Sequence, residues 1–133
     1  MNHMTDVTSQ ARTLPPAFVQ AATDRFADRF TCSPGVREHH GRDESPYAPM
    51  WPDAVVFASC TQDVVDLLTL CNAHKVPVVP YGAGTSLEGH ILAVQGGVSL
   101  DMSQMNRILS VNPEDLTVTV EPEKLHILAK TLR

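Results

Sequence analysis

Two short apolar runs separated by one amphipathic stretch most limit the folds open to this chain. Residues 54–58 and 76–79 have the length of strands buried on both faces. Between them, residues 61–75 have the spacing of an amphipathic helix. Its expected apolar face consists of Val64, Leu67, Leu68 and Cys71. Because parallel strands need a crossover of about a dozen residues, this order predicts a parallel βαβ unit with a right-handed connection.

The pattern after this unit predicts additional strands. A third strand is expected at residues 98–101, and a β-hairpin at 108–111 and 116–120, on either side of a turn at 112–115. A last helix is expected after Pro122, with an apolar face of Leu125, Leu128, Ala129 and Leu132. The predicted fold class is therefore α/β (α+β), a small parallel βαβ lobe plus a β-hairpin.

Residues 1–52 hold six of the ten prolines and five of the seven aromatic residues. Residues 14–30 are expected to form a helix, because apolar residues recur there every four positions and two prolines suit its first turn. Phe18, Phe26 and Phe30 are expected to pack against a larger body. The segment 31–53 is rich in Pro and Gly and is expected to be irregular. We therefore divide the chain into an N-terminal helical arm, 1–41, and a body, 42–133.

The charge of the chain excludes two classes of partner. Its 133 residues carry a formal net charge of -5, which offers no basic face to nucleic acid or to an anionic membrane. No apolar run approaches the roughly 20 residues of a transmembrane helix. The three cysteines show no C-x-x-C spacing and are expected to be free thiols, with Cys71 on a helix face. We therefore expect a cytoplasmic protein.

Residues 80–90, with the sequence PYGAGTSLEGH, are the segment that carries chemical information. They follow a predicted parallel strand, and open α/β sheets bind ligands at the carboxyl ends of such strands. Gly82 and Gly84 allow a close backbone approach, and Thr85 and Ser86 add hydroxyl donors, so an anion such as pyrophosphate would fit. Neither the dinucleotide fingerprint nor the triphosphate loop is present, because Leu87 replaces the third Gly and no Lys follows. The alternative is a turn that only reverses the chain.

Three segments together carry a family resemblance. They are HGRDESPYAPMWPDAVVFASCTQDV at 40–64, VPVVPYGAGTSLEGH at 76–90 and GGVSLDMSQMNRILSVNPEDLTVTVEP at 96–122. Their order and separations resemble the first half of the FAD-binding domain of the vanillyl-alcohol oxidase or p-cresol methylhydroxylase (PCMH) type. Within that type the resemblance is greatest to FAD-linked D-lactate dehydrogenases and to the glycolate oxidase flavin subunit. The resemblance implies the N-terminal lobe of such a domain, so that 42–133 is a partial FAD-binding domain.

The resemblance also implies which residues contact the cofactor. The expected FAD-binding residues are Pro80, Tyr81, Gly82, Ala83, Gly84, Thr85, Ser86, Gly89 and His90. His90 is either a donor facing the flavin or a solvated loop residue. His39 and His40 are expected on the surface rather than in a metal site, because no Cys or carboxylate lies at ligand spacing with both. Arg42, Asp43 and Ser45 lie either near the cofactor entrance or in a turn.

The resemblance implies an oxidoreductase that transfers a hydride from a D-2-hydroxy acid, most of all D-lactate, to FAD and passes electrons to a quinone or cytochrome. The sequence departs from the family after Pro122, where about four residues are absent, and it ends before a second flavin lobe and a substrate cap. We therefore assign no catalytic and no metal-binding residue, and expect this chain alone to be inactive. The complete protein is expected in the cytoplasm or at the periphery of the inner membrane. The alternative is a non-enzymatic residual or regulatory fragment that pairs with a separately encoded remainder.

Overall fold

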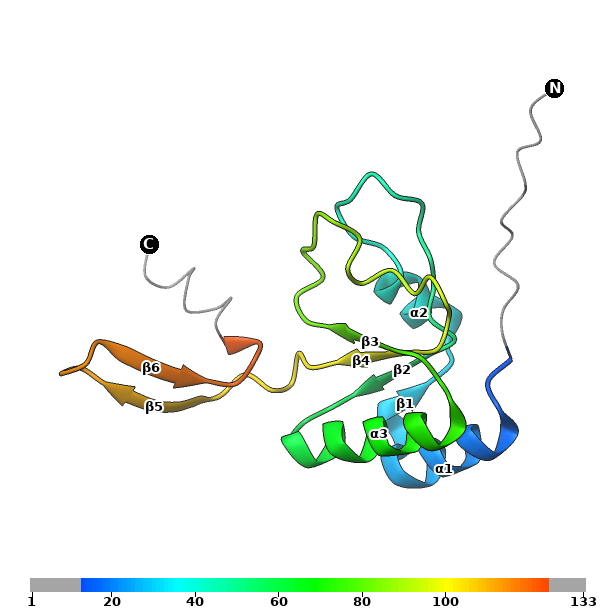
Figure 1. The fold of residues 1–133 in the computed structure, drawn as a ribbon, viewed down its shortest axis with the longest axis horizontal. Coiled ribbons are helices and arrows are strands. Elements are labelled where there is room, and N and C mark those ends of the chain that lie inside the picture. Colours follow the sequence, from blue (N-terminus) through cyan, green and yellow to red (C-terminus); the bar gives the residue numbers. More distant parts are fainter. Residues whose placement is uncertain (1–12, 125–133) are drawn as a thin grey trace.

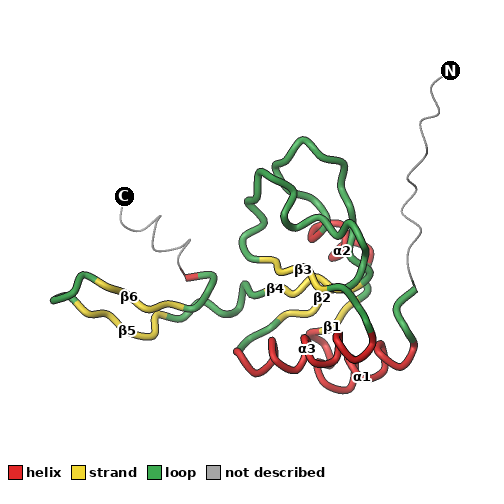
Figure 2. Tube along the Cα trace, in the orientation of Figure 1, coloured by secondary structure: helices red, strands yellow, loops and turns green. Residues whose placement is uncertain are grey.

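A four-stranded sheet organises the chain in the computed structural model, which describes residues 13–124. The strands are β1 (Phe30–Thr31), β2 (Ala54–Phe57), β3 (Val78–Tyr81) and β4 (Val98–Asp101). Their order is β1-β2-β4-β3, with β2, β4 and β3 mutually parallel and β1 antiparallel to β2. Figure 2 shows helices α1 and α3 on one side of this sheet, and α2 with two long loops on the other.

The predicted strand-helix-strand unit is confirmed, with one change in strand order. β2 and β3 are parallel and joined by α3 (Thr61–His74), but β4 lies between them and pairs with both. The second strand also begins two residues later than expected. The Val76 N–H bonds to the Cys71 carbonyl at 2.9 Å, and Lys75 adopts a left-handed conformation, so these residues end the helix instead of extending the sheet.

Alternation along the strands gives the sheet two different faces. Ala54 and Val56 of β2, with Val98 and Leu100 of β4, face α1 and α3 and belong to the main apolar core. Leu67 and Cys71 of α3 are buried in the same core, as expected. Leu68 is half exposed and does not belong to the buried face predicted for it. The next residue along each strand faces α2, so the two faces can serve different purposes.

The N-terminal helix α1 (Pro16–Phe26) is shorter than the expected 14–30. Ala27 has a φ of 51°, and the chain continues as a 3-10 turn, η1 (Ala27–Arg29), before it enters β1. Phe18 and Phe26 are buried in the core, and Phe30 packs against it from β1, as predicted from their spacing. Within the described residues the expected arm therefore packs on the lobe, while the division at residue 41 stays a prediction.

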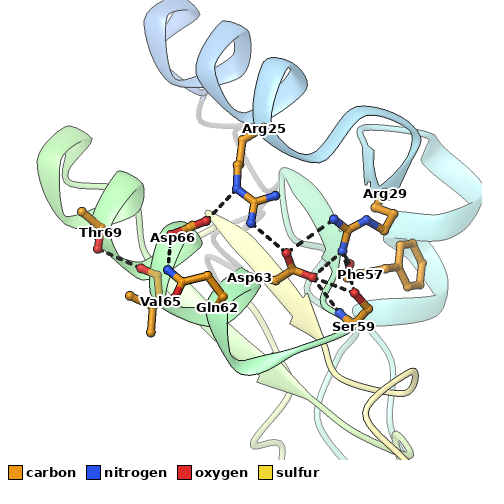
Figure 3. A network of polar contacts seen from close by, with 9 residues as sticks. All are labelled: Arg25, Arg29, Phe57, Ser59, Gln62, Asp63, Val65, Asp66 and Thr69. Atoms are coloured by element: carbon orange, nitrogen blue, oxygen red, sulfur yellow. Dashed lines mark hydrogen bonds and ion pairs between the residues drawn. The ribbon is translucent and has the colours of Figure 1, made fainter.

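A buried carboxylate ties α1, η1 and α3 together (Figure 3). Asp63 accepts hydrogen bonds from the guanidinium groups of Arg25 and Arg29 and from the backbone N–H and hydroxyl of Ser59. Its side chain is only 3% exposed. The bond from Arg29 holds the pKa of Asp63 far below its usual range. Arg25 also pairs with the more exposed Asp66 at 2.6 Å.

The segment 31–53 is not irregular throughout, contrary to expectation. Pro34–His40 forms helix α2, with Pro34 in its first turn, which is a position that proline favours. Seven residues are too few to give a clear amphipathic period, so composition alone indicated a loop. The rest of the segment, 41–53, has no regular structure and runs above the sheet beside the 82–97 loop (Figure 2).

The predicted hairpin is confirmed as β5 (Ile108–Asn112) and β6 (Thr117–Val120), which pair antiparallel. It projects away from the four-stranded sheet (Figure 1). Its exposed apolar side chains are Ile108, Leu109, Val111, Leu116 and Val118. The helix expected after Pro122 lies outside the described residues. Over 13–124, no helix is long and apolar enough to cross a bilayer.

Candidate FAD-binding site

The candidate site lies where three parallel strands end. Phe57, Asp101 and Tyr81 pair side by side as the last residues of β2, β4 and β3. Residues in register on parallel strands point to the same face, and here that face is the one that α2 covers. The loop 82–90 continues directly from Tyr81. The sheet therefore delivers the loop to the sheet edge at which open α/β folds bind ligands, as the sequence predicted.

A cleft of about 420 Å³ opens between this loop and α2. Tyr81, Ala83 and Gly84 form one wall. The opposite wall consists of Gly35, Glu38, His39, Arg42, Asp43 and Glu44. A volume in this range is typical of small-molecule and cofactor sites.

Gly84 is held tightly against the strand that precedes it. Its φ is +70°, a region that L residues rarely adopt. A Cβ at this position would collide with the Tyr81 hydroxyl, so the tyrosine ring lies directly under the loop. The Tyr81 hydroxyl also lies 3.3 Å from Nε2 of His39. Both the positive φ and the closeness of the Tyr81 hydroxyl thus require glycine at position 84.

The backbone N–H groups of residues 82–85 are available to a ligand. Within residues 13–124 they donate to no acceptor. Successive unpaired N–H groups in a turn conformation form an anion-binding concavity. The Glu123 carboxylate lies directly beside Gly82, since a Cβ added to this glycine would collide with Oε1 of Glu123.

Ser86 and His90 shape the second half of the loop. The Ser86 hydroxyl oxygen accepts the N–H groups of Glu88 and His90, each at 3.3 Å. The same oxygen also lies 3.0 Å from Nδ1 of His90, which is itself exposed. Ser86 is thus used for the shape of the loop.

Asp43 and Ser45 form a turn on the opposite wall. The Asp43 carboxylate accepts the N–H of Ser45 at 3.1 Å and also its hydroxyl. The hydroxyl bond lowers the pKa of Asp43, so the group is ionised. Its second oxygen, Oδ2, is buried and has no partner among residues 13–124. Arg42 is largely exposed and lies 3.3 Å from Glu38.

His40 is buried, which corrects the expectation that both histidines are on the surface. Its Nε2 lies 2.7 Å from Oδ2 of Asp101, and its Nδ1 lies 2.8 Å from the Val36 carbonyl. His39 is exposed, as expected, but it lines the cleft. Among the residues that the structure describes, no three His, Cys, Asp or Glu side chains converge as a metal site.

The structure thus brings some of the expected residues to the cleft and leaves others outside it. Tyr81, Ala83 and Gly84 line the cleft, and the remaining loop residues lie beside it. Pro80 pairs with Leu100 on the opposite face of the sheet and is exposed. Sequence reasoning missed Glu38 and His39, because it did not predict α2. The one signal for that helix is Ser33-Pro34, a cap residue followed by proline.

A loop with unpaired N–H groups at the carboxyl ends of parallel strands, facing a cofactor-sized cleft, is the arrangement expected of a ligand-binding lobe of an α/β protein. The chain belongs to the family described as FAD binding domain, whose family model matches residues 52–133. The resemblance seen in the sequence is therefore confirmed, and FAD is the cofactor of this family.

Named relatives and a solved structure agree with this assignment. The chain is 38% identical over 118 residues to D-lactate dehydrogenase [cytochrome], mitochondrial, of Arabidopsis thaliana, a match that covers 87% of this chain and 21% of that protein. It is 38% identical over 95 residues to glycolate oxidase subunit GlcD of Bacillus subtilis, covering 71% and 20%. A substrate-bound structure of p-cresol methylhydroxylase matches with a TM-score of 0.69 at 20% identity, over 89% of this chain and 26% of that one, which confirms the predicted fold class. The chain spans about a fifth of the length of these relatives.

The residues around the cleft fit part of FAD. Four unpaired N–H groups suit a pyrophosphate, and glycine allows the backbone to approach it. The opposite wall carries three carboxylates, Glu38, Asp43 and Glu44, against one arginine, Arg42, and therefore suits hydroxyl groups better than phosphate oxygens. The loop wall is thus the one that fits the charged part of the cofactor.

Proposed function

We propose that the 80–90 loop holds the pyrophosphate of FAD through the backbone of residues 82–85. The carrying observation is the run of unpaired N–H groups at 82–85 beside the cleft. Ala83 and Gly84 contribute backbone to the cleft wall, and the exposed ring of His90 lies at the end of the loop. In this assignment Ser86 fixes the loop shape instead of binding phosphate.

We propose that the complete protein oxidises a D-2-hydroxy acid, with D-lactate as the first candidate. The names of the relatives support this, since they include a D-lactate dehydrogenase and a glycolate oxidase subunit. Bound FAD supplies the redox step by accepting a hydride from the substrate α-carbon. The residues of this chain bind and orient the cofactor. Positioning of the hydroxy acid and transfer to a quinone or cytochrome belong to a second flavin lobe and a cap.

A location in a reducing compartment, the cytoplasm, is part of the same proposal. Cys32, Cys60 and Cys71 are all free. Free thiols are typical of reducing compartments. The complete protein would reach a membrane electron acceptor by peripheral association.

A non-enzymatic fragment that pairs with a separately encoded remainder is the second candidate function. The exposed apolar side chains of the β5–β6 hairpin favour it, because they offer a surface to another polypeptide. The two candidates differ in gene context. An adjacent reading frame that encodes the second lobe supports a split protein, and a continuous frame through both lobes rejects it.

A pair of charge substitutions in one loop tests the cofactor assignment. Ala83→Asp places a carboxylate in the cleft wall, and the control Leu87→Asp adds the same charge at an exposed position outside it. FAD binding is measured by titrating flavin fluorescence with each purified chain. We expect Ala83→Asp to weaken binding about tenfold or more and Leu87→Asp to change it about twofold or less. Equal effects of the two substitutions would refute the assignment.

Turnover tests the proposed division of labour between this chain and the rest of the protein. Small-ligand sites bury about 70% or more of the ligand, and one lobe covers only part of FAD. We therefore expect weak FAD binding and no dye-coupled D-lactate oxidation by the 133-residue chain with saturating FAD. Turnover above the free-flavin control would show that this chain contains catalytic groups of its own.

A further inference from the structure

His40 is the buried centre of a contact network on the cleft face of the sheet. The residue ends α2 and is 3% exposed. Its ring lies against that of Tyr81, with centroids 4.3 Å apart, and its edge meets Phe57 at 5.7 Å. Asp101 lies between these two strand ends in the sheet order. One imidazole therefore contacts the last residues of β2, β3 and β4.

Two hydrogen bonds fix the orientation of the His40 ring. Its Nδ1 donates to the Val36 carbonyl, 2.8 Å away, because a carbonyl can only accept. Its Nε2 lies 2.7 Å from Oδ2 of Asp101, and this contact shares one proton between the two groups. Burial opposes ionisation of Asp101, but the bonds from His40 and Ser103 outweigh burial and lower the pKa of that carboxyl. The ring is therefore held at both nitrogens, on one side by α2 and on the other by β4.

Aromatic side chains of two strands pack on the His40 ring, Tyr81 of β3 in a tilted arrangement and Phe57 of β2 in a T-shaped one. The other ionisable groups that face His40 are His39, on the same helix, and Tyr81. Burial raises the pKa of the Tyr81 phenol, which stays neutral. The Asp101 carboxylate is thus the one negative group in direct contact with the ring among the described residues.

The same contacts continue into the FAD loop. Tyr81 stacks on His40 and supports Gly84 with its hydroxyl. The Met102 N–H bonds to the Tyr81 carbonyl at 3.0 Å, and the Ser103 N–H bonds to the Asp101 carboxylate at 2.7 Å. Displacement of the imidazole would therefore remove the support under Tyr81 and change the position of Gly84.

We propose that His40, held between the Asp101 carboxylate and the Tyr81 ring, is a positioning residue that sets the conformation of residues 82–85 for the FAD pyrophosphate. This inference rests on the proposed function for its ligand. The effect of His40 on the conformation of the loop does not depend on whether FAD binds.

Three variants of the full 133-residue chain separate the elements of this proposal. His40→Gln keeps an amide donor for Asp101 but removes the ring. The conservative variant Asp101→Asn keeps the ring, because its amide donates to Nε2 of a neutral His40 and its oxygen accepts the Ser103 N–H. His74→Gln, at a half-buried histidine that packs on Phe18 away from the loop, is the control.

Two measurements are made on each chain, and thermal melting verifies that each is folded. Nitrogen-15 NMR of the imidazole gives the protonation of both ring nitrogens, and amide spectra give the environment of residues 82–85. A titration with FAD gives the affinity. In the parent chain and in Asp101→Asn we expect Nδ1 of His40 to carry the hydrogen that it donates to the Val36 carbonyl. We expect His40→Gln to shift the loop amides and weaken FAD binding about tenfold, with Asp101→Asn within about threefold and His74→Gln unchanged.

Each other outcome overturns a defined part of the proposal. An unprotonated Nδ1 in the parent chain rejects the placement of the His40 ring between Val36 and Asp101, and this result does not depend on whether any variant folds. Unshifted loop amides in His40→Gln reject the positioning role. If the parent chain binds no FAD, the proposed function fails, and the amide shifts alone decide the coupling.

Discussion

Replacement of Asp63 by Asn tests the physical account of how α1 is fixed to the lobe. The carboxylate is 3% exposed and pairs with Arg25 and Arg29, whose side chains are 39% and 29% exposed. Breaking a fully buried ion pair costs about 3–5 kcal/mol. Because both guanidinium groups reach water, we expect the free energy of unfolding to fall by about 2–3 kcal/mol. For a chain of this size that corresponds to a decrease of roughly 6–12 °C in Tm.

The control for this prediction is Asp66→Asn in the same network. Asp66 pairs with Arg25 alone among the arginines, and 31% of its side chain is exposed. A partly exposed pair contributes about 0–1 kcal/mol. Urea unfolding followed by circular dichroism measures both variants. Equal losses for the two variants, or a loss under 1 kcal/mol for Asp63→Asn, would refute the reasoning from burial.

Because of the Asp63 carboxylate, we expect the free energy of unfolding to depend on pH. The pKa of Asp63 is lower in the folded state than its ordinary value of about 3.9 in the unfolded chain. The folded state is therefore stabilised by Asp63 above about pH 4, and this stabilisation is lost as the pH falls further. We expect Asp63→Asn to flatten the acid side of a plot of unfolding free energy against pH. An unchanged acid slope would mean that other groups determine it.

Three further predictions concern the loop and the thiols. Glu123→Gln removes a carboxylate beside Gly82 that would repel the phosphates of FAD, so FAD titration should give a lower Kd. A higher Kd would contradict this electrostatic argument. Gly84→Ala forces a side chain into φ +70° and against a tyrosine hydroxyl, so urea unfolding should give a loss of about 1–3 kcal/mol. Burial raises the pKa of Cys71 to about 12, whereas Cys32 is exposed. At pH 8 a thiol reagent that forms mixed disulfides should therefore modify Cys32 in the folded chain and Cys71 only after unfolding. Prompt modification of Cys71 would contradict its burial.

The elements that local periodicity specifies were predicted from the sequence. The helix at 61–74 and the hairpin depend on contacts between residues near in sequence, and both were found at almost the expected bounds. The insertion of β4 between β2 and β3 depends on pairing with residues 98–101, which no local pattern encodes. Helix α2 was missed because seven residues carry little periodic signal.

The part of the candidate site that backbone N–H groups form was predictable from the sequence, because glycine positions mark it. Gly82 and Gly84 indicated an anion loop, and the family resemblance assigned FAD to it. The burial of His40 was not predictable, because its partner Asp101 is 61 positions away and becomes a neighbour only through the strand order. Likewise, no sequence pattern indicated that Ser86 bonds to His90 within the loop.

Amide NMR of the nitrogen-15-labelled chain during titration with FAD tests the central claim most directly. The claim is that the N–H groups of residues 82–85 bind the pyrophosphate. It predicts saturable shifts at these four amides with FAD and much smaller ones with riboflavin, which has the flavin ring but no phosphate. Shifts of equal size with riboflavin, or FAD shifts confined to the β5–β6 hairpin, would contradict it.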